Sequence, residues 1–170
     1  MGKKYLVLIY TCILLPSLLS SQTKSETIRR QKQAEAVTIV RDVYGVPHIF
    51  GKTDADCVFG LMYTQCEDDF YRVEMNYITM LGRTAELKTE NEVYEDLLVR
   101  MTIDSAGAVK DYERAPLWMK SLLQAWSDGI HYYLSTHPEV KPRLLTEFKP
   151  WYPLMYTDGS IAAIQTGGIE

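Results

Sequence analysis

The sequence has few of the residues that mark a metal-binding, nucleic-acid-binding or disulfide-stabilised protein. Its 170 residues include three histidines and three cysteines, and neither a His-x-x-x-His nor a Cys-x-x-Cys spacing occurs. The metal sites that those spacings define are therefore not predicted. Lys and Arg number 18 against 22 Asp and Glu, and basic runs occur only near the start and at residues 29–32. No nucleic-acid partner is expected.

A long apolar run is also missing. The apolar stretch at residues 5–15 follows Lys3 and Lys4 and precedes Pro16 and the serine-containing stretch 17–21. It is shorter than the roughly 20 apolar residues that span a bilayer, and its flanks are typical of a secretory signal peptide. We predict a signal peptide at 1–21 and an exported protein, periplasmic or secreted, without a stable membrane anchor. A retained anchor is the alternative.

Removal of residues 1–21 takes Cys12 and leaves Cys57 and Cys66. On one helix these two residues would be separated by a rise of about 13 Å, whereas bridged cysteines have Cα atoms within about 7 Å. They are predicted not to pair with each other and to be core residues.

The first part of the predicted mature chain contains a leader and a strand pair. Residues 22–35 are polar and basic without an apolar period, which predicts a flexible leader. Residues 36–42 and 45–50 are rich in β-branched residues and flank a Tyr-Gly turn, which predicts two antiparallel strands. Pro47 cannot donate to a ladder, so the second strand is expected at an edge or with its proline turned outward.

Three helical patterns follow. Thr53 and Asp56 resemble a capping box that opens a helix reaching Leu81, and Asp68 and Arg72 are spaced to pair on its surface. A weaker helix is predicted over residues 97–112 with a break at Gly107. A third begins at Pro116. Two stripes at three- and four-residue steps are expected to be buried: Phe59, Met62, Cys66, Phe70, Val73, Tyr77 and Leu81, and then Met119, Leu122, Leu123, Trp126, Ile130, Tyr133 and Leu134.

Four prolines at 138–153 predict an extended, turn-rich segment, and Asp158-Gly159-Ser160 predicts a cap for a short helix at 161–165. The chain is assigned no catalytic residue. His48, His131 and His137 are scattered and expected to be structural. Glu67, Asp68 and Asp69 point in different directions on a helix, so a salt-bridged or solvated face is favoured over an acid/base pair.

No motif in the sequence indicates a nucleophilic serine either. No Gly-x-Ser-x-Gly elbow occurs. Cleavage after Ser20 would make Ser21 the first residue, but it begins a flexible leader that cannot hold it against a substrate.

An ordered set of short motifs nevertheless resembles the penicillin acylase family, also called penicillin amidases or peptidase S45. The stretch Val37-Thr38-Ile39-Val40-Arg41-Asp42 leads into Tyr44-Gly45-Val46-Pro47-His48-Ile49, like that family's opening strands. Further matches follow at the family's spacing: Phe59-Gly60, Tyr63, Glu67-Asp68, Glu74-Met75, Gly82-Arg83, Ala85-Glu86, Asp128-Gly129 and Pro150-Trp151. The sequence departs from the family at Leu61 and Asp69.

The resemblance implies an α+β fold, the four-layer αββα fold of N-terminal-nucleophile hydrolases. Residues 36–170 would be an incomplete, α-chain-like N-terminal part of the acylase domain, mainly helical with a short antiparallel strand pair. It also implies an autoproteolytic precursor whose second chain begins with the nucleophilic serine, expected downstream of Glu170. In that chemistry the free α-amine is the base, and an oxyanion hole stabilises the tetrahedral intermediate.

The implied activity is hydrolysis of a linear amide of a small N-acyl compound, such as a β-lactam or an N-acyl homoserine lactone, with this chain inactive by itself. Its partner would be a β-chain-like segment of the same precursor. No cofactor is expected for catalysis, and a structural calcium is an expectation of the resemblance without assigned ligands. The alternative is a non-catalytic exported binding module, which the absence of a nucleophile favours.

Overall fold

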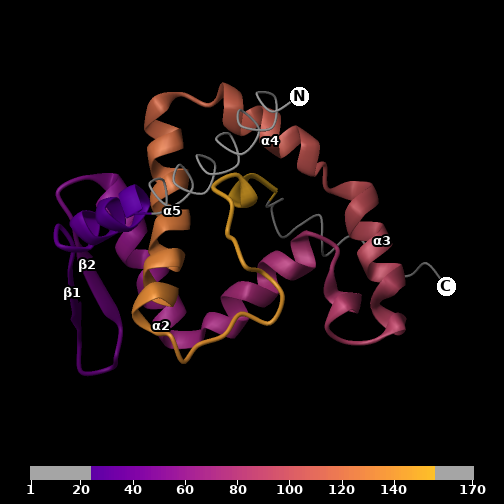
Figure 1. The fold of residues 1–170 in the computed structure, drawn as a ribbon, viewed down its shortest axis with the longest axis horizontal. Helices are drawn as coiled ribbons and strands as arrows, with labels where there is room; N and C mark the ends of the chain where they lie inside the picture. Colours follow the sequence, from indigo (N-terminus) through magenta and orange to yellow (C-terminus); the bar gives the residue numbers. More distant parts are fainter. Residues whose placement is uncertain (1–23, 156–170) are drawn as a thin grey trace, which may run out of the picture.

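A computed structural model describes residues 24–155, and most of these residues are helical (Figure 1). A helical stretch at 24–34 comes first. It is followed by β1 (Thr38–Arg41), β2 (Pro47–Phe50), α2 (Asp54–Met80), the short helices η1 (Thr84–Glu86) and η2 (Glu90–Glu92), α3 (Val93–Thr102), α4 (Ser105–Arg114), α5 (Leu117–Thr136) and η3 (Tyr152–Met155).

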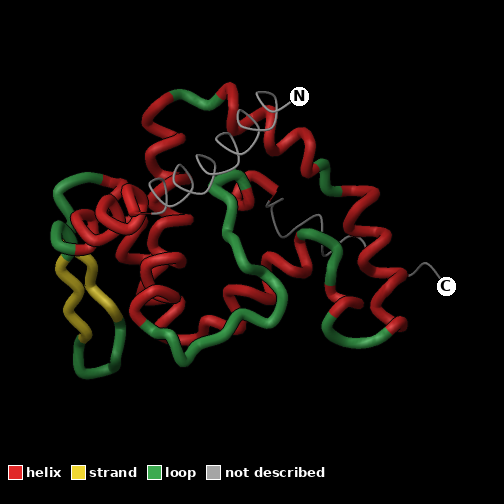
Figure 2. Tube along the Cα trace, in the orientation of Figure 1, coloured by secondary structure: helices red, strands yellow, loops and turns green. Residues whose placement is uncertain are grey.

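The predicted strand pair is confirmed. Strands β1 and β2 are antiparallel, with Thr38 opposite Phe50 and Arg41 opposite Pro47, and they lie at the opposite end of the molecule from α3 (Figure 2). Between them, Asp42 Oδ1 accepts hydrogen bonds from the backbone N–H groups of Tyr44 and Val46. Gly45 has φ +81°, a conformation that residues with a Cβ rarely adopt.

Helix α2 begins as predicted and then kinks. Thr53 Oγ1 accepts from the Asp56 N–H at 3.2 Å, and Asp56 Oδ2 accepts from the Thr53 N–H at 3.1 Å, which completes the capping box. Asp69 leaves helical geometry (φ −163°, ψ 81°), and its Oδ1 accepts from the Arg72 N–H. Asp69 therefore caps the second half of the helix.

The kink explains why the predicted Asp68–Arg72 pair is wrong. Arg72 Nε lies 3.2 Å from Asp69 Oδ2, whereas Asp68 Oδ1 lies 2.8 Å from Arg41 Nη2 on β1. A cap at Asp69 restarts the helix, so the four-residue spacing across it no longer places two side chains on one face.

The two long apolar stripes meet where α2 packs on α5, which confirms most of the predicted core. Every member of the α2 stripe except Leu81 is buried, as are Leu123, Trp126, Ile130 and Tyr133 of the α5 stripe. The other three members of the α5 stripe are half-buried: Met119, Leu122 and Leu134. The helices cross closely at Gly129, where an added Cβ would lie 2.5 Å from the Phe59 carbonyl oxygen. Only glycine permits this approach of the two backbones.

Residues 93–114 differ from the prediction of one helix broken at Gly107. They form α3 and α4, and the break lies at Ile103 and Asp104. Asp104 Oδ1 accepts from the Gly107 N–H at 2.8 Å. The aspartate therefore caps α4, and the glycine lies in its first turn, where an isolated glycine is tolerated.

The expectation of a flexible leader at 22–35 is wrong for its described part, because residues 24–34 are helical. Arg29 and Arg30 both pair with Asp128 of α5. This helix lacks an apolar stripe, and its charged contact lies 99 residues away in sequence. A local pattern could not reveal that contact.

Residues 138–151 contain no helix or strand, as predicted, and run back past α2 to η3 (Figure 1). The predicted signal peptide at 1–21 and helix at 161–165 lie outside the described residues. None of the described helices has the length and apolar character needed to cross a membrane.

Candidate functional site

Glu74 is a carboxylate with no exposed surface, in the second half of α2. Its Oε1 accepts from the N–H groups of Leu144 and Leu145 at 2.9 and 3.0 Å, and its Oε2 accepts from the Arg143 N–H at 2.9 Å. Three backbone donors thus take the place of water. The side chain fastens the returning segment to α2. Sequence reasoning noted Glu74 only as a family motif, although its place four residues after buried Phe70 was an available signal.

Asp128 is the second deeply buried carboxylate, with 1% of its side chain exposed. Arg29 reaches both carboxylate oxygens, at 2.7 and 3.1 Å, and Arg30 Nε donates to Oδ1 at 2.9 Å. Gln124 Nε2 also donates to Oδ1 at 3.2 Å. The sequence identified the Asp128-Gly129 motif but not these partners.

Each of the three histidines makes its own local contacts. His131 is half-buried; its Nδ1 lies 2.8 Å from the Ser127 carbonyl oxygen, and its Nε2 accepts from the Phe148 N–H at 3.4 Å. Burial lowers the pKa of His131, so the neutral ring is favoured. His137 stacks on Tyr133, with ring centroids 4.2 Å apart.

His48 is exposed and lies 3.4 Å from Asp42 Oδ2. The hydrogen bond from the Val46 N–H lowers the pKa of Asp42 most. The contacts with the Tyr44 N–H and the His48 ring lower it further. This histidine therefore supports the hairpin turn. Each of the three histidines thus makes a contact within the folded chain, in keeping with the expected structural role.

The acidic triplet on α2 is a salt-bridged surface, as interpreted from the sequence. Arg41 Nη2 lies 3.0 Å from Glu67 Oε2, and Asp69 pairs with Arg72. Within residues 24–155, no group of three or more His, Cys, Asp or Glu side chains could hold a metal ion. The structural calcium stays a prediction.

Cys57 and Cys66 are both free thiols, as predicted; Cys66 is buried, whereas Cys57 is half-buried and is not the core residue that was expected. Cys66 is 1% exposed, and burial raises its pKa to about 12. A thiol with that pKa is almost wholly protonated at neutral pH and is a poor nucleophile. Cys66 is therefore a packing residue of the α2 stripe.

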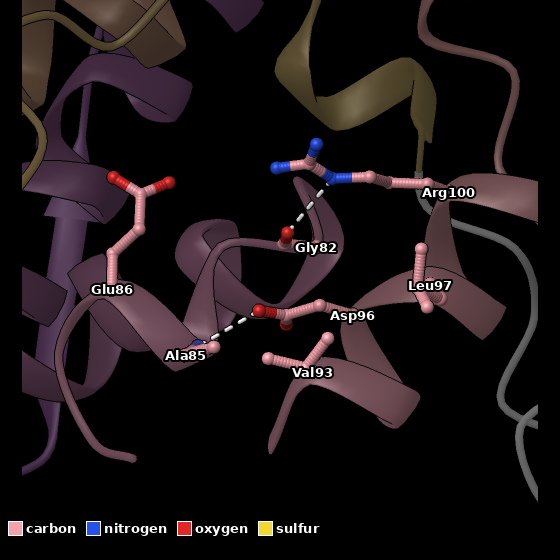
Figure 3. Close-up of a pocket in the computed structure, with 7 residues that line it drawn as sticks. All are labelled: Gly82, Ala85, Glu86, Val93, Asp96, Leu97 and Arg100. Atoms are coloured by element: carbon pink, nitrogen blue, oxygen red, sulfur yellow. Dashed lines mark hydrogen bonds between the residues drawn. The ribbon is translucent and has the colours of Figure 1, made fainter. Parts of the chain in front are cut away.

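A pocket of about 200 Å³ lies between the turn after α2 and helix α3 (Figure 3). Asp96 accepts from the N–H groups of Thr84 and Ala85 at 2.9 and 2.8 Å, and Arg100 Nε donates to the Gly82 carbonyl at 2.9 Å. Gly82 has φ +59°, and an added Cβ would lie 2.6 Å from the Asp96 carbonyl oxygen. These polar groups are used to hold the turn.

Glu86 lines the same pocket and is held by Arg83, whose Nε and Nη2 donate to its two oxygens at 2.6 and 2.7 Å. The Arg83 contact lowers the pKa of Glu86. The motif residues at 82–86 thus close helix α2 and its turn.

A second hollow, of about 250 Å³, lies at the junction of α3 and α4 beside η3. It is lined by Thr102, Ile103, Asp104, Gly107, Ala108, Asp111, Leu154 and Met155. It is the hollow next to the last described residues, where the chain continues towards 156–170.

The motifs that carry the family resemblance therefore occupy structural positions. Gly60 lies against Ile49 and Val37, where an added Cβ would approach their side chains to 2.6 and 2.8 Å. Glu74 holds residues 143–145, and Gly129 permits the helix crossing. Together the described residues form a helical scaffold with one antiparallel strand pair.

Comparison with known proteins shows the family to which the chain belongs. The model of the penicillin amidase family matches residues 36–167, and the chain belongs to that family. It is 28% identical over 120 residues to penicillin acylase 2 proenzyme from a Pseudomonas species, and 27% identical over 132 residues to penicillin G acylase from Escherichia coli. These alignments cover 69% and 72% of this chain but 16% of each relative.

The fold is also found in a solved structure. The thermostable penicillin G acylase from Alcaligenes faecalis matches with a TM-score of 0.65 at 22% identity, over 79% of this chain and 76% of that one. The expected fold class, the mainly helical N-terminal part of an N-terminal-nucleophile hydrolase with a short strand pair, is confirmed.

Proposed function

We propose that this chain is the α-chain-like part of an exported acylase that hydrolyses a linear amide. The observation that carries the proposal is the family domain over residues 36–167, whose motif residues make the contacts that hold the scaffold together. Two relatives that match this domain are named penicillin acylases. The predicted signal peptide at 1–21 supports export to the periplasm or the medium.

In this proposal the nucleophile is an N-terminal serine located beyond Glu170. Its free α-amine removes the hydroxyl proton, so no histidine from this chain is required. Donors of the same catalytic segment form the oxyanion hole. The contacts of His48, His131 and His137 are consistent with this division, because each ring already has a structural contact.

The contribution of the described residues is to place the segment that leads towards the substrate. Glu74 and His131 hold the backbone at 143–148, and η3 follows against the hollow at the α3–α4 junction. We propose that the segment after Trp151, most of which lies outside the described residues, approaches the acyl group of an N-acyl substrate, such as a β-lactam or an N-acyl homoserine lactone. Its partner is a β-chain-like segment from the same precursor.

The test is expression of the complete gene and measurement of amine release from a panel of acyl amides with different acyl chains. The serine at the start of the matured second chain is replaced by alanine, and a serine elsewhere on the surface of that chain by alanine as the control. We expect amine release from at least one substrate, lost in the first variant and kept in the second. A precursor that matures into two chains but releases no amine contradicts the proposal.

A structural calcium ion is part of the same proposal, on family resemblance. Purified enzyme treated with a chelator should lose thermal stability, and added Ca²⁺ should restore it because the ion binds only the folded state. Melting curves that are unchanged by the chelator contradict this part and leave the catalytic proposal standing.

A further inference from the structure

The helix at residues 24–34 precedes the penicillin amidase domain, whose match begins at residue 36, and yet it makes contacts with that domain. The Tyr132 hydroxyl of α5 donates to Gln31 Oε1 at 3.2 Å. Gln33 Nε2 donates to the Ala55 carbonyl of α2 at 3.4 Å. The helix is therefore seated on both long helices of the core.

Its strongest contact is with Asp128. This carboxylate is 1% exposed, and the side chains of Arg29 and Arg30 are 48% and 19% exposed. Arg29 binds both carboxylate oxygens through two N–H groups, and Arg30 adds a third charged hydrogen bond. A buried carboxylate that loses its cations is costly, because neither water nor the remaining Gln124 amide compensates its charge. The planar fork of arginine fits this double contact well.

We infer that residues 24–34 are a structural element of the mature protein, whose two arginines neutralise Asp128 and so stabilise α5 within the folded domain. The buried charge of Asp128 inside the family domain is then neutralised by two residues that lie before the domain begins. A consequence is that any cut that removes the N-terminal segment falls before Arg29.

Thermal melting of the full-length protein tests the inference. The variants are R29Q/R30Q, D128N, and the three substitutions together, with K32Q, an exposed lysine of the same helix, as the control. R29Q/R30Q is expected to lower the melting temperature by roughly 5–10 °C, because it leaves a buried carboxylate without cations. In the D128N background the same two substitutions should have much less effect, because a neutral amide needs no cation. K32Q should melt like the wild type.

The dependence of the R29Q/R30Q effect on residue 128 distinguishes two explanations. Charge neutralisation requires Asp at position 128, whereas simple packing of the helix on the surface does not. An R29Q/R30Q protein that melts like the wild type, or that loses as much stability with Asn at position 128 as with Asp, overturns the inference. If R29Q/R30Q does not fold, folding of the triple variant supports it, and failure of both overturns it.

The intact mass of the protein purified from its native cells supplies an independent test. A mass that includes Arg29 and Arg30 supports a retained helix. A mass that lacks either residue overturns it. Neither this measurement nor the melting series depends on amide hydrolysis, so a failed acylase proposal would be seen separately.

Discussion

Two segments outside the long helices lie against the α2–α5 pair, and they are held by different chemistry. Residues 143–148 are held through their backbone N–H groups, which donate to Glu74 of α2 and His131 of α5. Residues 24–34 are held mainly through side chains, above all the two arginines that bind Asp128. Both anchoring carboxylates are buried, but only the second is neutralised by cations in these contacts.

The difference determines which substitutions each segment tolerates. A backbone donor is present whatever the side chain, except in proline. The hydrogen bonds to Glu74 therefore do not depend on the side chains at 143–145, although Leu145 is also a core residue, whereas they are lost when Glu74 is replaced. A guanidinium is lost with a single substitution, so the helix at 24–34 depends on its own sequence. The Glu74 contact lies inside the family domain and uses backbone donors, which most substitutions keep. The Asp128 contact reaches outside that domain and uses side-chain donors, which a single substitution removes.

The largest effect is expected from E74A. Three backbone N–H groups would lose their acceptor inside the protein, at about 1–3 kcal/mol for each unsatisfied group, so we expect a loss of about 4 kcal/mol in the free energy of unfolding. Urea denaturation measures it. E74Q, which keeps one acceptor oxygen, should lose less. E67Q on the exposed face of the same helix is the control, and a loss in E74A no greater than in E67Q would show that Glu74 does not hold the segment.

The next largest effect is expected from G129A, at the point where α2 and α5 cross. An added Cβ at Gly129 would meet the backbone of α2, so G129A must push apart α2 and the helix that carries Asp128 and His131. Overpacking costs about 1–3 kcal/mol, partly offset by the roughly 1 kcal/mol gain of alanine over glycine in a helix. We expect a net loss in unfolding free energy, measured in urea.

G60A is the matched comparison, because its Cβ would meet the side chains of Ile49 on β2 and of Val37 just before β1 rather than a backbone. It should destabilise less than G129A. A larger loss in G60A would mean that the strand pair, and not the helix crossing, limits the packing around α2.

A smaller, pH-dependent effect is expected at His131. Burial lowers its folded pKa below the unfolded value of 6.5, so the unfolded chain binds more protons between the two values. The contribution of this residue is therefore complete above pH 6.5 and is lost as the pH falls towards the folded pKa. Protonation also removes the Nε2 lone pair that accepts from Phe148.

Urea denaturation at pH 7.5 and 5.5 measures this difference. H131Q should show a weaker decline in unfolding free energy on acidification than the wild type, because glutamine does not titrate. An equal decline in both proteins would assign the acid sensitivity to other groups.

The smallest effect is expected from R143A. The Arg143 side chain lies over the Tyr71 ring at 4.5 Å, an exposed cation–π contact worth about 0.5–1 kcal/mol. Its N–H still donates to Glu74 in the alanine variant. A loss of unfolding free energy comparable to that of E74A would show that the Arg143 side chain, and not only its backbone N–H, holds the segment.

Much of the fold followed from local patterns. The capping box at Thr53 and Asp56, the strand pair and the apolar stripes of α2 and α5 arise from interactions a few residues apart, which periodicity and capping residues record directly. The ordered motifs also pointed to the family that the comparisons then showed. The break lies at Asp104 and not at the predicted Gly107, because the Asp104 side chain caps α4.

What the sequence by itself determined is the set of amphipathic elements, the unpaired buried cysteine Cys66 and the family to which the chain belongs. Only the tertiary structure decided the partners of the buried charges. Glu74 meets donors 69 to 71 residues away, and Asp128 meets cations 98 and 99 residues away, in a stretch whose polar sequence predicted no fixed structure. The physical reason is that a buried charge must be satisfied, but any donor that the fold brings near can satisfy it.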